Sequence, residues 1–320
     1  AKENTPAYKI EYQNADSMQS VFTKELHQKY ANVKFKKKSK NVSVYESKNY
    51  KVKVKDLDKM IEFYRHVLGF HLINEENDMA IMGIGSQKRK LLGLIREPEG
   101  KEGSNTLTGL YHVAFVFPTR EEFALFLKHL LLTNYPIEGK SDHGYAESVY
   151  INDPECNRIN IGWDKPESEW PIKEGKINGV TKVLNIQSFL SKVKGEFDEI
   201  SDETKMGHVH LSVSNLDESF AFYHDVLGFS LKNNDLISTK FLSINDYHHH
   251  IALNEWTPAA NCSAIKNTDL GVDHITFEMP TIDSLIELKE QLETKQVEYY
   301  FNKGKKIIGL SDPNGIQLWF

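Results

Sequence analysis

A strand that leads directly into a helix is the feature of this sequence that most constrains its fold. From residue 206 to residue 213, apolar and polar side chains alternate, which is the periodicity of a strand. Leu216, Phe220, Tyr223 and Leu227 then follow at spacings of four, three and four residues. This spacing places them on one face of an amphipathic helix, so the pattern predicts a strand and a helix packed against it.

Both ends of this predicted helix carry residues that suit a helix terminus. Asn215 comes just before the first turn, where a side-chain oxygen can accept a hydrogen bond from a free backbone N–H. Gly228 comes just after the last turn, where the backbone often becomes left-handed. The strand that carries His208 is therefore predicted to turn straight into the helix.

An earlier stretch of the chain repeats this unit at one fixed offset. The identical pairs are Leu57 and Leu216, Asp58 and Asp217, Phe63 and Phe222, Tyr64 and Tyr223, Val67 and Val226, Leu68 and Leu227, Gly69 and Gly228, Phe70 and Phe229, and Leu72 and Leu231. The position of His208 is occupied by Asn49 in the earlier copy. The chain is therefore a duplication whose two copies differ in their chemistry.

A second pair of units follows the same rule. The residues shared at equivalent positions are Gly109 and Gly271, His112 and His274, Phe115 and Phe277, Pro118 and Pro280, and Thr119 and Thr281. The whole pattern predicts an α+β fold of four tandem βαβββ units.

The units predict the following division of the chain. Residues 1–46 form an N-terminal extension, 47–166 a first domain of units one and two, 167–205 a connector, and 206–320 a second domain of units three and four. Within the extension a helix is predicted from Asp16 to about Tyr30. A short helix is also predicted near residues 184–193 of the connector.

The charge balance argues against nucleic acid as a partner. Lysine and arginine number 39 against 45 aspartates and glutamates, which gives a net charge of -6. The most apolar run, residues 123–132, contains Lys128 and His129 and is too short to span a bilayer. The N-terminus lacks the apolar segment of a secretory signal. Because Cys156 and Cys262 form neither a disulfide framework nor a metal motif, we expect a cytoplasmic location.

Four short motifs resemble those of a known superfamily. They are Gly109-Leu110-Tyr111-His112, Ser141-Asp142-His143-Gly144, Gly207-His208-Val209-His210-Leu211 and His248-His249-His250-Ile251-Ala252-Leu253-Asn254. With the four units, they resemble the vicinal oxygen chelate superfamily of glyoxalase I, bleomycin-resistance proteins and extradiol dioxygenases. The resemblance covers residues 47–320 and is strongest to bacterial two-domain catechol 2,3-dioxygenases. It implies curved mixed sheets, Fe(II) or Mn(II), a small aromatic substrate and dioxygen, and it is compatible with a homo-oligomer.

The resemblance also assigns roles to individual residues. His112 and His208 match the two metal-binding histidines, and His249 matches the active-site histidine of a His-x-x-Ala-Leu strand. His143 and Tyr150 match a histidine and a tyrosine that precede an Asp-Pro turn. The position of the family's metal-binding glutamate, however, is occupied by Asn160.

The residue types explain why this departure matters. Neutral imidazoles suit ferrous and manganous ions, and a carboxylate adds an anionic oxygen donor. An amide at position 160 would bind such an ion more weakly and leave the site one charge more positive. Histidines with a pKa near neutrality can also move substrate protons. Strand alternation places His112 with Ala114, and His208 with His210, on one strand face each.

Two arrangements of the site are open at this point. The preferred one combines units two and three through His112, His143, Tyr150, Asn160, His208 and His249. It requires unit two to pack against unit three and unit one against unit four. The alternative combines units three and four around His208, His249 and His274, with Trp319 at the glutamate position and Gln317 as the nearest weak donor. If residues 248–250 form a strand, alternation would prevent all three histidines from facing the same site.

The resemblance implies a non-haem, metal-dependent extradiol dioxygenase, or a close descendant, that acts on catechol- or hydroquinone-like aromatics. His249, His143 and Tyr150 would be its catalytic residues. The alternative is a non-catalytic protein of the same fold that binds or sequesters a small aromatic ligand, as bleomycin-resistance proteins do. A third possibility is a lyase or isomerase of the glyoxalase type.

Overall fold

The computed structural model describes residues 46–86, 88–101, 108–173, 176–190, 193–233, 236–256 and 268–320. The helix predicted from Asp16 lies outside these ranges. Among the described residues, no helix combines the length and apolar character needed to cross a membrane.

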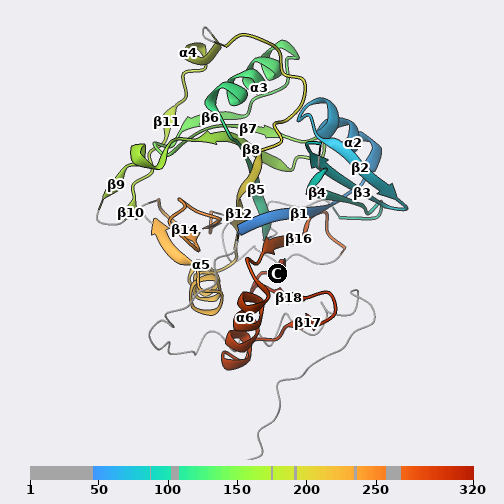
Figure 1. Cartoon of the computed structure of the whole chain (residues 1–320), viewed down its shortest axis with the longest axis vertical. Helices are drawn as coiled ribbons and strands as arrows, with labels where there is room; N and C mark the ends of the chain where they lie inside the picture. Colours follow the sequence, from blue (N-terminus) through green and yellow to red (C-terminus); the bar gives the residue numbers. More distant parts are fainter. Residues whose placement is uncertain are drawn as a thin grey trace, which may run out of the picture.

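The chain forms the four predicted βαβββ units (Figure 1). Unit one comprises β1 (Glu46–Val54), α2 (Leu57–His66), β2 (His71–Glu76), β3 (Met79–Ile84) and β4 (Arg89–Arg96). Unit two comprises β5 (Gly109–Phe117), α3 (Arg120–Leu132), β6 (Gly139–Asp142), β7 (Ala146–Asn152) and β8 (Arg158–Asp164). Unit three comprises β12 (Lys205–Ser212), α5 (Leu216–Ala221), the π-helical turn η3 (Phe222–Val226), β13 (Ser230–Asn233), β14 (Thr239–Ser243) and β15 (Ile251–Asn254). Unit four comprises β16 (Gly271–Glu278), α6 (Ile282–Thr294), β17 (Tyr300–Asn302), β18 (Ile307–Ser311) and β19 (Gln317–Trp319).

The connector is more structured than its polar sequence indicates. It contains the 3₁₀ helix η2 (Glu167–Glu169), the short strands β9 (Ile172–Lys173), β10 (Lys176–Ile177) and β11 (Lys182–Val183), and the helix α4 (Gln187–Leu190). The short helix α4 falls inside the range predicted for it. β9 and β10 form a hairpin, whereas β11 extends the edge of a large sheet beside β6.

The four units combine into two mixed sheets, and each sheet takes one unit from each half of the chain. The nine-stranded sheet has the order β11-β6-β7-β8-β5-β12-β15-β14-β13 and joins units two and three. The eight-stranded sheet has the order β17-β18-β19-β16-β1-β4-β3-β2 and joins units four and one. The predicted pairing of the units and the α+β fold are therefore confirmed.

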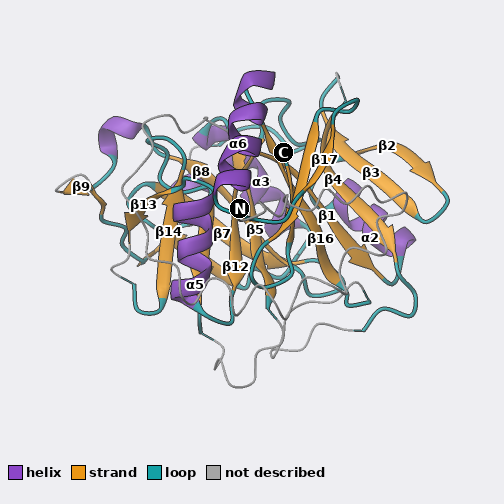
Figure 2. Ribbon diagram, turned by 90° about the horizontal axis from the view of Figure 1, so that it is seen from below, coloured by secondary structure: helices purple, strands orange, loops and turns teal. Residues whose placement is uncertain are grey.

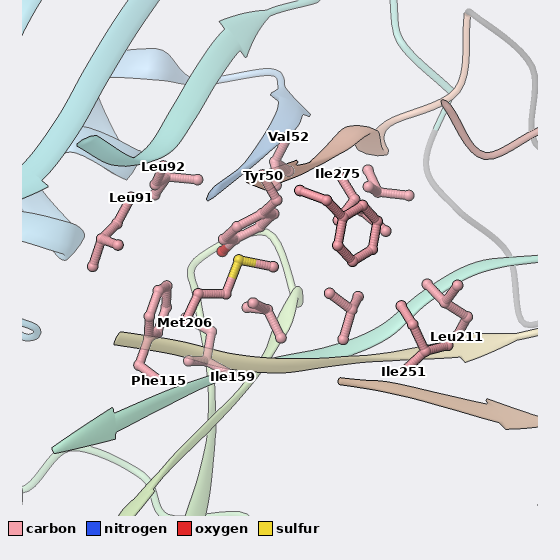
Figure 3. Packing of buried hydrophobic residues seen from close by; sticks show 14 of the residues in the cluster. Tyr50, Val52, Leu91, Leu92, Phe115, Ile159, Met206, Leu211, Ile251 and Ile275 are labelled. Atoms are coloured by element: carbon pink, nitrogen blue, oxygen red, sulfur yellow. The ribbon is translucent and has the colours of Figure 1, made fainter. Parts of the chain in front are cut away.

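The two sheets pack their inner faces against each other to form the core. In Figure 3, Tyr50 and Val52 of β1 and Ile275 of β16 lie opposite Phe115 of β5 and Met206 of β12. These side chains are at most 3% exposed. Because successive strand residues point to opposite faces, the residues between these core positions face away from the core.

The helical segment formed by α5 and η3 begins and ends where the sequence predicts. The Asn215 side chain accepts a hydrogen bond from the Glu218 backbone N–H at 2.9 Å, and Gly228 has a φ of 84°. The regular α-helix nevertheless ends at Ala221 and continues as the π-helical turn η3. In Figures 1 and 2 this segment runs beside α6, and the Gln291 side chain of α6 donates to the carbonyl oxygen of Val226.

A buried hydrogen bond connects the helical segment of unit three to the Asp-Pro turn of unit four. The Tyr223 hydroxyl donates to Asp312 Oδ2 at 3.0 Å, and both side chains are buried. Burial raises the pKa of Asp312 to about 6, although the backbone N–H groups of Ile316 and Asn314 oppose this rise. The tyrosine therefore satisfies a carboxyl group that has no contact with water.

Replacing Tyr223 with phenylalanine is expected to lower the free energy of unfolding by about 1–3 kcal/mol, because Asp312 loses a donor that water cannot replace. Urea denaturation measures the change. The matched control is Tyr299→Phe, since that hydroxyl donates to the exposed Glu293. The control should change the free energy by less than about 0.5 kcal/mol. Equal losses in the two variants would contradict the role given to Tyr223.

Candidate active site

A cavity of about 480 Å³ lies against the nine-stranded sheet. Its walls come from β5, β7, β8, β12, β14, the loop before β15, and the connector. Among its lining residues are His112, His143, Tyr150, Asn160, His208 and His249. The structure thus brings every residue of the preferred predicted site to one cavity.

Strand alternation and register bring His112 and His208 together at the cavity wall. On β5, His112 and Ala114 line the cavity, whereas Val113 and Phe115 belong to the core. β12 runs antiparallel to β5, and His208 is paired with Ala114. The Nε2 atoms of His112 and His208 consequently face each other at 3.1 Å.

Asn160 reaches the same face from the neighbouring strand β8. β8 runs parallel to β5, and Asn160 is paired with Ala114, so the two side chains point to the same side of the sheet. Asn160 is 4% exposed. His210 also lies on this face, with its ring centre 4.9 Å from that of His112. Its Nε2 accepts a hydrogen bond from the Asn254 side-chain amide at 3.1 Å, so this nitrogen is already engaged.

Burial keeps the histidines of this wall uncharged at neutral pH. Desolvation lowers the pKa of His112 and His208 well below the usual value, and the neighbouring histidines add to the effect. Burial, followed by the charge of Arg158, lowers the pKa of His210 to about 3. Neutral imidazole is the form that binds a metal ion, so these rings need no deprotonation before they act as ligands.

The arrangement of the donors can be compared with what a divalent cation requires. Neighbouring ligands that lie about 2.1 Å from an octahedral ion are about 3.0 Å apart, which is close to the observed spacing of the His112 and His208 Nε2 atoms. Across the described ranges, no three histidine, cysteine, aspartate or glutamate side chains form a metal-binding group. Neither Nδ1 atom of the pair has a hydrogen-bond partner in the described structure. The spacing of the two nitrogens therefore fits a cation. In the part of the chain that the structure describes, the site has no carboxylate to add negative charge, and no hydrogen bond to either Nδ1 orients the two rings.

Two consecutive histidines, His248 and His249, line the cavity next to His208. They precede β15 and lie in a loop, so strand alternation does not apply to them. Both line the cavity, whereas His250 turns away and its Nδ1 is 2.9 Å from Ser243 Oγ. The strand interpretation of residues 248–250 is therefore wrong for this run. The ring centre of His249 lies 4.0 Å from that of His208.

A hydrogen-bonded chain connects His249 to a buried carboxylate. The Nδ1 atoms of His248 and His249 are 2.8 Å apart, and His248 Nε2 lies 3.1 Å from Asp164 Oδ1. The second oxygen of Asp164 accepts a hydrogen bond from the Tyr247 hydroxyl. Burial alone would raise the pKa of Asp164, but the contact with His248 outweighs it and the pKa is lowered. Because Asp164 is an ionised acceptor, His248 carries a proton on Nε2, and its Nδ1 can accept from the Nδ1–H of His249.

This chain determines which nitrogen of His249 can receive a proton. When both histidines are neutral, the His249 proton is on Nδ1, so Nε2 keeps its lone pair. A proton taken up at Nε2 can be passed from Nδ1 to His248, whose positive charge then lies next to the Asp164 carboxylate. The chain thus gives a proton taken up by His249 a path toward Asp164, although burial lowers the pKa of His249 well below its usual value and opposes that uptake.

His143 and Tyr150 form a second pair at the cavity. Their Nε2 and hydroxyl oxygen are 3.0 Å apart, and His143 Nδ1 is 3.2 Å from the Val180 carbonyl oxygen. The carbonyl can only accept, so His143 Nδ1 carries the proton and Nε2 accepts from the tyrosine hydroxyl. Burial raises the pKa of Tyr150 to about 12, which keeps the phenol protonated.

The alternative arrangement around His274 is not assembled. His274 lies on β16 and Gln317 on β19, both in the eight-stranded sheet. His274 Nδ1 is 2.7 Å from Asp273 Oδ2, and the Gln317 amide donates to Ser311 Oγ at 2.6 Å. The Trp319 ring packs 5.8 Å from the imidazole of His274. The two residues are thus engaged locally, in a different sheet from His208.

Several lining residues lie outside the set predicted from the sequence. Arg158 and Asp164 lie on β8 an even number of residues from Asn160, so all three side chains point to the same face of the strand. Counting by two from Asn160 could therefore have identified them from the sequence. Ile177 and Val180 come from the connector, whose polar composition carries no sign of this role. Their contribution depends on where the connector folds, which is a tertiary effect.

Comparisons with known proteins identify the family of the chain. The sequence profile of the Glyoxalase/Bleomycin resistance protein/Dioxygenase superfamily matches residues 48–161 and 205–320. The chain is 32% identical over 267 residues to a catechol-2,3-dioxygenase of Bacillus subtilis, covering 82% of this chain and 92% of that protein.

Solved structures show the same fold at lower sequence identity. A putative dioxygenase from Bacillus subtilis superimposes with a TM-score of 0.59 at 14% identity, covering 87% of this chain and 85% of the other. Glyoxalase I from Zea mays gives a TM-score of 0.52 at 14% identity, covering 87% and 92%. The profile matches both halves of the chain, and the four units form the expected paired sheets. The protein therefore belongs to the Glyoxalase/Bleomycin resistance protein/Dioxygenase superfamily.

Proposed function

We propose that this protein is a metal-dependent extradiol dioxygenase that opens the ring of catechol- or hydroquinone-like aromatics. The observation that carries the proposal is the convergence of His112 and His208 at 3.1 Å in the same cavity as the His249 hydrogen-bonded chain. The similarity to a protein named catechol-2,3-dioxygenase over most of the chain supports the same reaction class.

In this proposal, His112, His208 and Asn160 hold the cation, which is Fe(II) or Mn(II). A ferrous or manganous ion bound there supplies Lewis acidity and access to dioxygen chemistry. His249 accepts a substrate hydroxyl proton at Nε2, and the chain through His248 places the resulting charge beside Asp164. Tyr150 provides a protonated hydroxyl at the cavity wall, positioned by His143.

The remaining walls suit a flat aromatic ligand. The Phe241 ring lies 5.0 Å from His249, and the Trp256 ring lies 5.4 Å from His210 and 5.1 Å from Tyr111. Aromatic side chains bury aromatic ligands in offset or edge-to-face contacts and exclude water from the reacting groups. These aromatic walls favour an aromatic substrate over an aliphatic one.

The second candidate is a non-catalytic protein that binds a small aromatic molecule. Asn160 is the observation that favours it, because a neutral amide replaces the anionic ligand of the family and weakens the hold on a divalent cation. Metal content of the purified protein, measured together with a catechol assay for the yellow ring-opened product, separates the two candidates. Bound Fe(II) or Mn(II) with product formation supports the enzyme. Aromatic binding without either supports the binder.

Replacing His249 with asparagine is expected to slow ring cleavage by about 10²–10⁴-fold, because the group that receives the substrate proton is lost. Metal content should stay unchanged, since His249 acts on the substrate and is not a ligand. Steady-state kinetics with catechol and metal analysis of the same preparation test both statements. Loss of metal from the variant would instead make His249 a ligand.

The neighbouring His250 provides a matched control for this experiment. Its imidazole contacts Ser243 and lies outside the set that lines the cavity. His250→Asn should therefore retain most of the turnover per folded molecule, with folding checked by circular dichroism. A comparable loss of turnover in both variants would indicate general disruption of the loop.

A further inference from the structure

Arg158, the first residue of β8, places a guanidinium group at the cavity without an acidic partner. Its Cζ lies 4.8 Å from the centre of the Tyr150 ring and 5.4 Å from that of Tyr111. Its Nη1 donates to the Tyr111 hydroxyl at 2.9 Å, whereas its buried Nε has no hydrogen-bond partner in the described structure. No aspartate or glutamate of the described ranges forms an ion pair with it.

The carboxylate of the cavity lining does not form an ion pair with Arg158 in the described structure. The side chains that line the cavity include one carboxylate, Asp164, which is engaged by His248 and Tyr247. The other nitrogen-containing side chains of the wall are histidines, a tryptophan and asparagines, and the lining includes no lysine. The lining thus carries one positive and one negative charge, and Asp164 is held by His248 and Tyr247 and not by Arg158. A half-buried, unpaired guanidinium next to a ligand cavity is a ready partner for an anion.

We infer that Arg158 is a carboxylate-recognition residue, and that the aromatic ligand of this cavity carries a carboxylate substituent. A guanidinium can form two parallel hydrogen bonds to a carboxylate through its two Nη groups, and in the described structure Arg158 donates from one of them, to Tyr111. This inference rests on the proposed function for the identity of the ring, but the recognition of the charge does not depend on turnover.

The positions of Arg158 and His112 indicate how the carboxylate of the ligand would lie relative to its hydroxyl groups. The Tyr150 ring stands next to both residues, with its centre 5.6 Å from the His112 ring and 4.8 Å from the guanidinium. An aromatic ring of similar size alongside Tyr150 could direct its hydroxyl groups to the histidines and its carboxylate to Arg158. The ligand class is therefore a dihydroxylated aromatic acid, with the acid on the side of the ring away from the reacting oxygens.

The test compares two probes that differ only in charge, 3,4-dihydroxybenzoate and 3,4-dihydroxybenzamide. Binding is measured by isothermal titration calorimetry under anaerobic conditions, so that no turnover occurs. The parent protein should bind the acid about ten- to hundred-fold more tightly than the amide, as expected for a charge-assisted hydrogen bond in a partly buried site. Equal affinity for the two probes, or binding of neither, would overturn the inference.

Three variants separate charge recognition from a structural role. Arg158→Met should bind the two probes with equal affinity, and Arg158→Lys should keep part of the preference because it keeps the charge but not the paired donors. Lys59→Met removes a positive charge from the exposed face of α2 and should leave the preference unchanged. If Arg158→Met fails to fold, as judged by thermal unfolding, the size of the preference in Arg158→Lys decides the question, and it should be smaller than in the parent. A preference that survives in a folded Arg158→Met, or one of the parent's size in Arg158→Lys, would overturn the inference.

The same probes distinguish failure of this inference from failure of the proposed function. Preference for the acid without ring cleavage of either probe would retain the charge recognition and contradict the dioxygenase proposal. Cleavage of both probes with equal affinity would retain the dioxygenase and contradict the role of Arg158.

Discussion

The Asn160→Glu variant is expected to bind Fe(II) or Mn(II) at least about ten-fold more tightly than the parent protein. The substitution would place a carboxylate beside His112 and His208 and complete a two-histidine, one-carboxylate set of donors. Attraction between unit charges at contact distance is several kcal/mol even at an effective dielectric constant of about 20. The gain should shrink in acid, because protonation of the new carboxylate competes with the metal.

Competition with a metal indicator, repeated between neutral and acidic pH, measures this gain. Asn74→Glu is the matched control, since it adds the same charge on the exposed part of β2 in the other sheet. It should leave metal affinity unchanged. If the parent is a slow dioxygenase, catechol cleavage should rise in Asn160→Glu as well. If the parent is a binder, metal affinity should rise without turnover. A folded Asn160→Glu protein with unchanged metal affinity would show that position 160 is not a ligand position.

The His112→Ala variant is expected to lose metal affinity by at least about a hundred-fold, whereas His274→Ala should retain it. His112 supplies one of two convergent imidazole nitrogens, and a methyl group offers no donor in its place. His274 occupies the equivalent position of unit four, but it lies in the other sheet beside Asp273 and Trp319. The pair therefore tests which of two duplicated histidines belongs to the site.

Metal titration of both variants, with thermal unfolding to confirm that each is folded, provides the measurement. Loss of metal in His274→Ala with retention in His112→Ala would move the site to the eight-stranded sheet. Loss in both would indicate that the two sheets depend on each other for stability, and His112→Gln and His274→Gln would then separate the donor from the packing effect.

The sequence by itself determined the repeating unit and the helix termini. Alternation, the amphipathic spacing and the two terminal residues Asn215 and Gly228 are local properties, and each depends on the backbone within one or two turns. The duplication carried the same local rules to all four units, so the α+β class followed from them. The face on which His112 lies followed from the strand period alone.

Identification of the preferred site also came from the sequence, but its assembly is a tertiary property. His112 and His274 occupy the same position in their units, three residues after Gly109 and Gly271. Only His112 lies beside His208. The two differ because β5 pairs with β12, while β16 pairs with β1. Local periodicity is the same in both units, so only long-range strand pairing could separate them.

Tertiary structure alone decided the surroundings of the histidines. His248 and His249 both reach the cavity because they lie in a loop, where the two-residue period of a strand no longer governs direction. Asp164 is far from them along the chain and meets His248 only because β8 ends beside that loop. Hydrogen bonds, burial and the resulting pKa shifts depend on distances between such distant segments. A single sequence states which residue types are available, and the packing of the sheets determines which of them share a cavity.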